Sequence, residues 1–446
     1  MRLSGTRVTA IAQGRGFGNQ LWDLAGVPPS LDLPFAESKS LVDATTGRNL
    51  VTFTRASSGT HVGSDGLIKT ATTNEARFDH NPTTGESLGL LVEESRTNLL
   101  VQSEDFSTTW TTTGFLAFGS GSTVNATQAP NGLLAADLLT ENSAANYHNV
   151  SRTTVTLSGY QAVSVYAKSA GRSFLSIGLG ETTRAAAIFD LSNGSCLAST
   201  TNATYDNVSC SCVNFGNGWY RCVLTASQLD ATSRRISFSL SDTYAVPGNG
   251  QGRVYTGDGT SGIYLWGAQL EAGAFPTSYI PTTSSTVTRS ADVASISGSN
   301  FSSWYRQDEG TLFYDQTVLS YPPAANAALL HASDGTGSNY IGAFIPSGIN
   351  HRTVIRKSGV NELLQNAIPA IDVLRRAEVA IALKENNSNS AGNGIALLAD
   401  TSCQLPAVDR LTFGEASGGV NMSTRIRRLT YWPQRLPNET LQTITQ

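Results

Sequence analysis

Short segments that alternate apolar and polar residues, separated by turns, dominate this chain of 446 residues. Residues 161–169 (QAVSVYAKS), for example, place Val163 and Val165 on one face. Such a two-residue period fits a strand that buries one face. Glycine (42 residues), serine and asparagine fill the intervals, and these residues favour turns. Because no amphipathic helical pattern intervenes between these segments, the sequence predicts an all-β protein of tandem β-sandwich or jelly-roll modules.

The same alternation extends to the C-terminus, with two exceptions. Residues 361–376 (NELLQNAIPAIDVLRR) predict a short helix that Pro369 interrupts. Residues 437–442 predict a terminal helical turn with Asn438 as its cap. The other expected strands are residues 50–56, 174–180, 186–194, 218–226, 235–242, 262–271, 310–319, 377–385, 410–415 and 424–434.

Composition along the chain predicts four regions. Residues 1–48, which contain a glycine-rich stretch and two adjacent prolines, predict an extended N-terminal arm. Residues 49–100 predict a β-strand connector, residues 101–288 a jelly roll, and residues 289–446 a second β-sandwich. The stretch 275–292, rich in serine, threonine and proline, is the expected linker between the last two.

Charge and hydropathy exclude two classes of partner. Only 14% of residues are charged and the net charge is -4, so no basic face suited to nucleic-acid phosphates is expected. No apolar run reaches the roughly 18 residues of a membrane span. The N-terminus also lacks the apolar core of a signal peptide. We therefore expect neither nucleic-acid binding nor insertion in a membrane.

The cysteines leave two alternatives open. A disulfide from Cys196 to Cys210 or to Cys222 would form in an oxidising medium, whereas buried, reduced thiols suit a protein made in a cytoplasm. We favour reduced thiols. No histidine lies near the cysteines in the sequence, which argues against zinc. The five cysteines are Cys196, Cys210, Cys212, Cys222 and Cys403.

Four stretches carry a resemblance to a known family: residues 53–80 (FTRASSGTHVGSDGLIKTATTNEARFDH), 85–110 (GESLGLLVEESRTNLLVQSEDFSTTW), 263–292 and 426–444. Together they resemble fibre and spike proteins of tailed bacteriophages, of the head-spike-fibre or tail-fibre type. The resemblance covers most of residues 30–446, in the same order. The 101–288 region is similar to carbohydrate-binding jelly rolls, and the C-terminal region resembles concanavalin-like or laminin-G sandwiches.

The resemblance implies a virion structural protein without enzymatic activity. It is expected to be a homotrimer, made in the host cytoplasm, that joins other virion proteins through residues 1–48. Host-surface polysaccharide is the implied external partner. The repeats of parallel β-helices, which polysaccharide-degrading tailspikes contain, are not found in the sequence. The alternatives are an architectural capsid-decorating or baseplate component without sugar binding, and a virion-associated glycan hydrolase or lyase.

Glu93 and Glu94 test the enzymatic alternative. A glycosidase needs two carboxyl groups on one cleft, about 5–9 Å apart. Adjacent residues of a strand point to opposite faces, and those of a helix diverge by about 100°. We therefore predict that these carboxylates belong to the framework, with one of them paired to Arg96 or capping a turn.

Aromatic side chains beside polar groups are candidates for sugar binding, because a ring covers the C–H face of a pyranose while polar neighbours bind its hydroxyls. Trp110 with Asp105 is one such candidate, and Trp219 with Tyr220 is another. Core packing is the alternative interpretation for each ring. Tyr264 and Trp266, also considered, share a face that we expect to be core.

The remaining predictions concern virion attachment and metal binding. Phe17, Leu21 and Trp22 are the apolar candidates for virion attachment within the N-terminal arm. No metal site or other cofactor is predicted, and no histidine is predicted to be functional. Calcium is considered at the turns Asp206-Asn207, Asp258-Gly259 and Asp334-Gly335, although none has the D-x-[DN]-x-[DN]-G pattern of a calcium loop.

Overall fold

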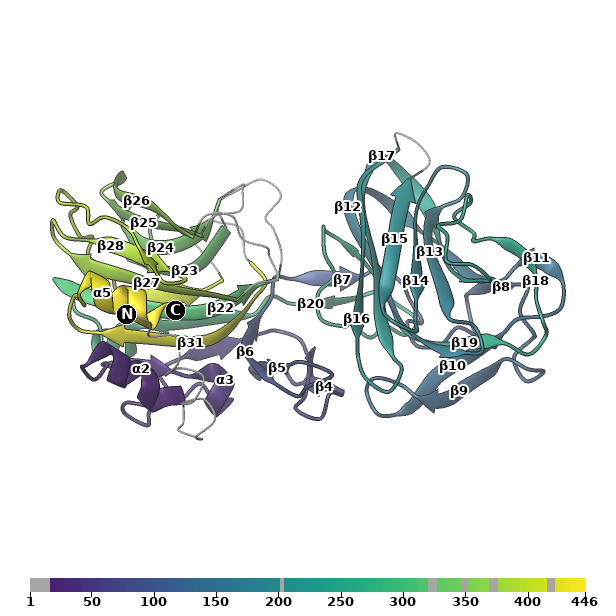
Figure 1. The fold of residues 1–446 in the computed structure, drawn as a ribbon, viewed down its shortest axis with the longest axis horizontal. Coiled ribbons are helices and arrows are strands. Elements are labelled where there is room, and N and C mark those ends of the chain that lie inside the picture. Colours follow the sequence, from purple (N-terminus) through teal and green to yellow (C-terminus); the bar gives the residue numbers. More distant parts are fainter. Residues whose placement is uncertain (1–16, 201–203, 320–326, 347–350, 369–375, 415–421) are drawn as a thin grey trace, which may run out of the picture.

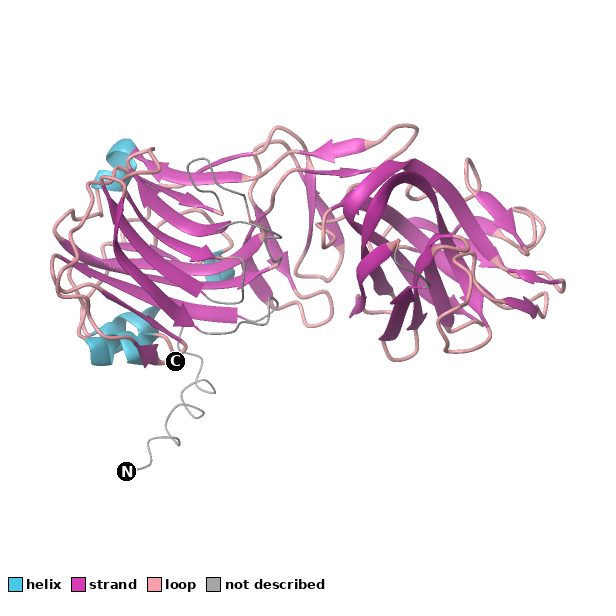
Figure 2. Ribbon diagram, turned by 90° about the horizontal axis from the view of Figure 1, so that it is seen from above, coloured by secondary structure: helices cyan, strands magenta, loops and turns pink. Residues whose placement is uncertain are grey.

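A computed structural model describes residues 17–200, 204–319, 327–346, 351–368, 376–414 and 422–446. Antiparallel strands make up nearly all of its regular structure, and the few helices are short (Figure 2). The predicted all-β class with tandem sandwich modules is therefore confirmed. No helix among the described residues is long and apolar enough to cross a membrane.

Two lobes joined by a narrow neck form the molecule (Figure 1). The neck is an antiparallel pair of short strands, β7 (Arg96–Asn98) and β20 (Val287–Arg289), through which the chain leaves one lobe and returns to it. Residues 99–286, between these strands, form what we call the inserted module. Residues 21–98 and 287–446 together form the split module.

The split module is a sandwich of two sheets whose facing side chains form one core, which includes Leu31, Phe35, Leu329 and Tyr431. One sheet has the order β29-β28-β27-β22-β31-β6-β5, with β1 also paired to β31. Its strands are β1 (Leu31–Leu33), β5 (Arg77–His80), β6 (Ser87–Val92), β22 (Glu309–Val318), β27 (Arg376–Lys384), β28 (Asn389–Gly392), β29 (Ile395–Ala396) and β31 (Thr424–Trp432).

The second sheet of the split module has the order β2-β21-β30-β23-β24-β25-β26. Short helices and the hairpin of β3 and β4 flank the sandwich. The strands are β2 (Thr52–Thr54), β21 (Val293–Ser297), β23 (Ala327–Ser333), β24 (Tyr340–Ile345), β25 (His351–Lys357), β26 (Val360–Ile368) and β30 (Arg410–Phe413). The flanking elements are α2 (Phe17–Ala25), α3 (Phe35–Ser38), β3 (Gly59–Val62), β4 (Ile68–Ala71), α4 (Gly298–Ser302) and α5 (Asn438–Ile444).

The N-terminal region corrects the predicted domain boundaries. Residues 31–33 form β1, which pairs with β31 near the C-terminus, and both Leu31 and Leu33 are fully buried. The described part of the predicted 1–48 arm is thus folded into the split module; residues 1–16 lie outside the described residues. Strands of the predicted 49–100 connector likewise join both of its sheets. A strand pattern reports burial but not which distant strand pairs with it, so the sequence missed this closure.

The inserted module is a second sandwich built on two long strands, β12 (Asn149–Ala170) and β17 (Tyr220–Ser241). Their pairing shifts register near residues 153–159. On one side of this shift β17 also pairs with β13, and β12 with β8; on the other side β17 pairs with β16, and β12 with β19, all within one ten-stranded sheet. The remaining strands are β8 (Thr111–Thr113), β9 (Thr123–Gln128), β10 (Leu134–Thr140), β11 (Ala145–Tyr147), β13 (Phe174–Gly180), β14 (Arg184–Asp190), β15 (Ser195–Thr200), β16 (Tyr205–Asn214), β18 (Val254–Thr256) and β19 (Gly262–Ala272).

A disulfide between Cys196 and Cys210 joins β15 to β16. The preference for reduced thiols was wrong for this pair, and the alternative pairing of Cys196 with Cys210 is confirmed. Strands β15 and β16 each end a run of hydrogen-bonded strands, so the bond fastens two sheet edges that lack a ladder between them. Cys212, Cys222 and Cys403 are free.

The two helical predictions near the C-terminus had different outcomes. Residues 360–368 form strand β26, paired with β25 and burying Leu363, so the predicted helix is wrong there. Neighbouring strands in the sheet override the local helical preference. Pro369 lies outside the described residues. The terminal helix α5 is confirmed, but Pro437 rather than Asn438 occupies its N-cap position.

Two buried histidines predict a pH dependence for the split module. Burial lowers the pKa of both His331 and His351 to about 4, below the roughly 6.5 of an unfolded chain. Their stabilising contribution is therefore complete above pH 6.5 and is lost as the pH falls towards 4. Between pH 7 and pH 5 each should remove about 2 kcal/mol from the free energy of unfolding.

Urea unfolding at pH 7 and pH 5 measures this change. The variant His351→Gln should show a smaller loss between the two pH values than the unsubstituted protein, because glutamine does not titrate. An equal loss in both proteins would contradict the assignment to His351.

Candidate functional site at the module junction

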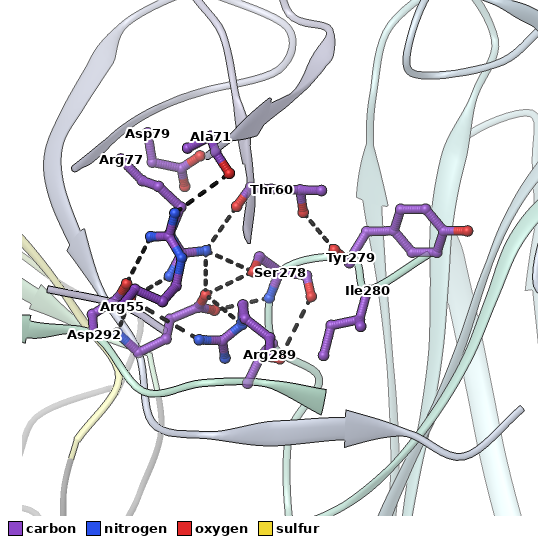
Figure 3. Close-up of polar contacts among 12 residues, drawn as sticks. Arg55, Thr60, Ala71, Arg77, Asp79, Ser278, Tyr279, Ile280, Arg289 and Asp292 are labelled. Atoms are coloured by element: carbon purple, nitrogen blue, oxygen red, sulfur yellow. Dashed lines mark hydrogen bonds and ion pairs between the residues drawn. The ribbon is translucent and has the colours of Figure 1, made fainter. Parts of the chain in front are cut away.

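A cluster of five charged side chains lies where the neck meets the split module (Figure 3). Each side chain is at most 2% exposed. The cluster comes from four separate parts of the chain, brought together by the sheets: the ends of β2 and β6, the start of β5, and the segment from β20 to β21. We call it the junction cluster; its members are Arg55, Arg77, Glu93, Arg289 and Asp292.

Asp292 and Arg77 are the centre of the junction cluster. Asp292 accepts from Arg55 Nη1 at 3.0 Å through Oδ1, and its Oδ2 is bonded to Arg77 Nη2. The same Oδ2 accepts from the backbone N–H of Glu93 at 2.8 Å. Buried charges of this kind require partners of opposite sign and hydrogen bonds to their remaining atoms, and Asp292 has both.

Glu93 connects the split module to the inserted one. Its Oε2 lies 2.8 Å from Arg77 Nη1 and 3.6 Å from Arg289 Nε. Its carboxylate also accepts from both the backbone N–H (2.8 Å) and the hydroxyl (2.7 Å) of Ser278, in the inserted module. Burial opposes its charge, but Arg289 and Arg77 outweigh burial and lower the pKa of Glu93 well below its usual range. Glu93 therefore stays ionised.

A second cluster, of aromatic and apolar side chains, lies on the inserted-module side of the contact between the two modules. The rings of Trp266 and Tyr279 have centroids 4.5 Å apart, and Tyr166 lies 5.3 Å from Trp266. Ile68, from β4 of the split module, packs into the same cluster. Its backbone N–H donates to Pro130 O at 2.9 Å, and Thr60 Oγ1 donates to Tyr279 O. Apolar burial and hydrogen bonds thus fasten the two modules beside the neck.

The junction cluster is a structural site rather than a reaction centre. Its carboxylates are ion-paired and sealed from solvent, so no substrate reaches them. Glu94, on the other side of the strand end, pairs with Arg96 at 2.5 Å. The prediction that these adjacent carboxylates form framework, with one bound to Arg96, is confirmed.

Trp110 and Asp105, predicted to bind sugar, make packing contacts and hydrogen bonds within the protein. Trp110 is 7% exposed, with ring centroids of Phe106 and Phe238 at 5.1 and 5.7 Å, and its Nε1 donates to Gln102 O. Asp105 accepts hydrogen bonds from Ser107 and Thr108 in its own turn. The structure does not offer this ring as a stacking surface, because apolar neighbours cover it.

Trp219 and Tyr220 are also buried, at 3% and 8% exposure. They point to opposite faces of the strand that begins here: Trp219 joins the aromatic cluster of the junction, whereas Tyr220 joins the core of the inserted module. Trp219 Nε1 donates to Gln128 O at 3.1 Å. The alternative of core packing therefore describes both rings.

The predicted attachment residues lie on α2, which packs against α5. Leu21 is 9% exposed and Trp22 is half-buried, with its Nε1 donating to Asp32 Oδ2 at 3.1 Å. The side chain of Phe17 lies outside the described residues. Attachment through this region stays a prediction.

In the turns considered for calcium, the carboxylates accept hydrogen bonds from neighbouring residues of the same turn. Asp258 accepts from the backbone and hydroxyl groups of Thr260 and Ser261, and Asp334 from Thr336 and Asn339. Asp206 accepts from Asn207. Within the described ranges, no group of three or more histidine, cysteine or acidic residues is placed to hold a metal ion.

Two open pockets are lined by residues other than those of the junction cluster. The larger, of about 410 Å³, is lined by residues that include Lys39, His61 and Phe78 of the split module. The smaller, of about 320 Å³, is lined by Thr153, Glu181, Arg235 and their neighbours in the inserted module. An ion pair of 2.9 Å joins Arg235 to Glu181 across it.

Sequence reasoning missed the three arginines and Asp292 of the junction cluster. The only available signal was weak: Arg55 lies near the end of the expected strand of residues 50–56, and Arg77 lies in no segment expected to be a strand. Charged residues at strand ends are ordinary on a surface, however. Only the meeting of four chain segments shows that these charges neutralise one another.

Comparisons with known proteins give partial similarities only. No protein-family model matches the chain, and no curated protein matches it significantly. Solved structures similar to part of it include the Ruminococcus gnavus IT-sialidase CBM40 bound to α2,3-sialyllactose (17% identity, TM-score 0.27, 31% of this chain and 84% of that chain). Others are the K499G mutant of Streptococcus pneumoniae NanB sialidase (16%, 0.28, 33% and 26%) and the botulinum neurotoxin serotype D binding domain (12%, 0.28, 34% and 40%). At these scores the similarities do not indicate what this chain binds.

Removing one charge of the junction cluster should be strongly destabilising. In Arg77→Met, Glu93 and Asp292 lose their shared partner while remaining buried, which typically costs 3–5 kcal/mol in unfolding free energy. Arg410→Met, which removes an exposed pair with Asp409, is the matched control and should change stability little. Urea denaturation compares the two variants, and similar losses would contradict the central role of Arg77.

Substitution of Trp110 distinguishes core packing from sugar stacking. Trp110→Ala should lower the unfolding free energy by about 3–5 kcal/mol, because it opens a cavity beside Phe106 and Phe238. Calorimetry measures this loss. A variant of unchanged stability would show that the ring is not part of the core.

Proposed function

We propose that the chain is a fibre or spike protein of a tailed-bacteriophage virion, which projects from the particle and adheres to host-surface glycan. The sealed junction cluster is the observation that carries this proposal. A projecting protein must hold its outer module at a fixed angle to its base. Ion pairs buried at a neck, supported by an apolar cluster, resist bending there because a small displacement would separate the paired charges while they are still shielded from water.

The sequence resemblance supports the same proposal. Three of the stretches that resemble phage fibre and spike proteins supply the junction cluster. Residues 53–80 contain Arg55 and Arg77, residues 85–110 contain Glu93, and residues 263–292 end in the segment with Arg289 and Asp292. The third stretch is far from the first two in the chain but meets them at the neck, so the resemblance describes one three-dimensional unit.

In this proposal the split module lies towards the particle and the inserted module faces outwards. Residues 1–48 contact other virion proteins, with Leu21 and Trp22 near that surface. Three chains associate as a homotrimer, and many copies of a weak glycan site give strong overall attachment through effective concentration. The chain transforms no substrate.

A purely architectural role, as a capsid-decorating or baseplate component, is the second candidate. One observation favours it: Trp110, Trp219 and Tyr220, the aromatic residues predicted to contact sugar, are all buried. The virion-associated hydrolase or lyase is the third candidate, and the ion-paired states of Glu93 and Glu94 count against the carboxylates first considered for it.

Labelled antibodies against the inserted module, viewed by electron microscopy on intact particles, test the location. We expect label at the tips of projections; label absent from particles would overturn the virion proposal. A glycan array with the full chain at micromolar concentration tests adhesion. Binding supports it, and no binding favours the architectural role. Steady release of reducing ends from host polysaccharide would overturn the non-enzymatic assignment.

A further inference from the structure

Four of the five cysteines lie on three neighbouring strands of the inserted module. Cys196 of β15 is already bonded to Cys210 of β16. Two residues further along β16, Cys212 stands directly opposite Cys222 of β17 in the antiparallel register. The sulfur atoms of Cys212 and Cys222 are 3.9 Å apart. Residues two apart in a strand share a face, so both cysteines of β16 point to the same side.

We propose that Cys212 and Cys222 are a site of covalent modification, at which a second, cross-strand disulfide forms on oxidation. Directly opposed residues of an antiparallel pair have Cα atoms about 4.5–5.5 Å apart, within the range that a disulfide spans. The sulfurs must approach from 3.9 Å to bonding distance, about 2 Å. Rotation of the two side chains can supply this movement without a new strand register.

A small disulfide such as oxidised glutathione would be the oxidant. The thiolate of Cys212 attacks one glutathione sulfur, forming a mixed disulfide and releasing one glutathione thiolate. The thiolate of Cys222 then attacks the Cys212 sulfur and releases the second. The two protein thiols lose two protons and two electrons; the electrons reduce the oxidant to two glutathione thiolates, which take up the two protons.

The surroundings of the two sulfurs set the order of these steps. Cys212 is half-buried and accessible to a small oxidant, whereas Cys222 is fully buried. Burial, followed by the neighbouring Cys212, raises the pKa of the Cys222 thiol well above its usual value. Cys222 is therefore the slow partner, and its proximity to Cys212 compensates for its small thiolate fraction.

Two disulfides would link β15, β16 and β17 covalently in sequence. Strand β16 pairs only with β17 among the described strands, and β17 also pairs with β12 and β13 in the central part of the sheet. The second bond would therefore prevent β16 from peeling away from the sandwich. This inference is independent of the proposed function, because it rests on the cysteines alone.

Thiol counting and peptide mapping of the intact, folded chain test the proposal. After the folded chain is incubated with oxidised glutathione and then denatured without reductant, alkylation should fall from the three free cysteines to Cys403 alone, with a mass loss of about 2 Da for the two hydrogens removed. The map should contain a 212–222 cross-link, and the thermal midpoint of the inserted module should rise by a few degrees.

Matched variants separate the bond from other effects of oxidation. Cys403→Ser should keep both the cross-link and the thermal shift, whereas Cys212→Ser should lose both. Because Cys212 is half-buried, serine is tolerated there better than at Cys222. Three outcomes would overturn the proposal: both thiols remaining alkylatable, a stable glutathione adduct on Cys212, or pairing of Cys212 with Cys196 or Cys210.

Discussion

The structure depends on the neutralisation of buried charge at the neck. Three guanidinium groups and two carboxylates are removed from water there, and each would be strongly destabilising alone. They are stable only together, when β2, β5, β6 and the β20–β21 segment are all in place. The junction cluster therefore couples correct assembly of the split module to correct placement of the inserted one.

This coupling explains how a module of nearly two hundred residues can interrupt a sandwich. The strands on either side of the insertion, β7 and β20, pair directly. The two ends of the interrupted chain therefore lie side by side in the split module. Ser278 and Tyr279 lie near the end of the inserted module, where the chain returns to the split module. Their hydrogen bonds and the aromatic cluster join this segment to the split module. The neck is narrow, but both polar and apolar contacts join the two modules beside it.

The inserted module meets a different constraint. Its sheet order leaves β15 and β16 at edges, without a ladder between them. The Cys196–Cys210 disulfide closes this seam covalently. A covalent closure protects edge strands from the pairing with other chains that open edges invite.

Local patterning predicts the class of fold, the positions of most strands, and the framework role of Glu93 and Glu94. These follow from a two-residue period and from side-chain direction. Three features became visible only in the folded chain: β1 pairs with β31, the jelly roll is an insertion, and Trp110 and Trp219 are covered. Each of these depends on which distant segment lies opposite, and neither alternation nor composition encodes the partner. The clustering of the junction arginines could not be predicted from the sequence for the same reason, because their counter-charges lie up to 237 residues away.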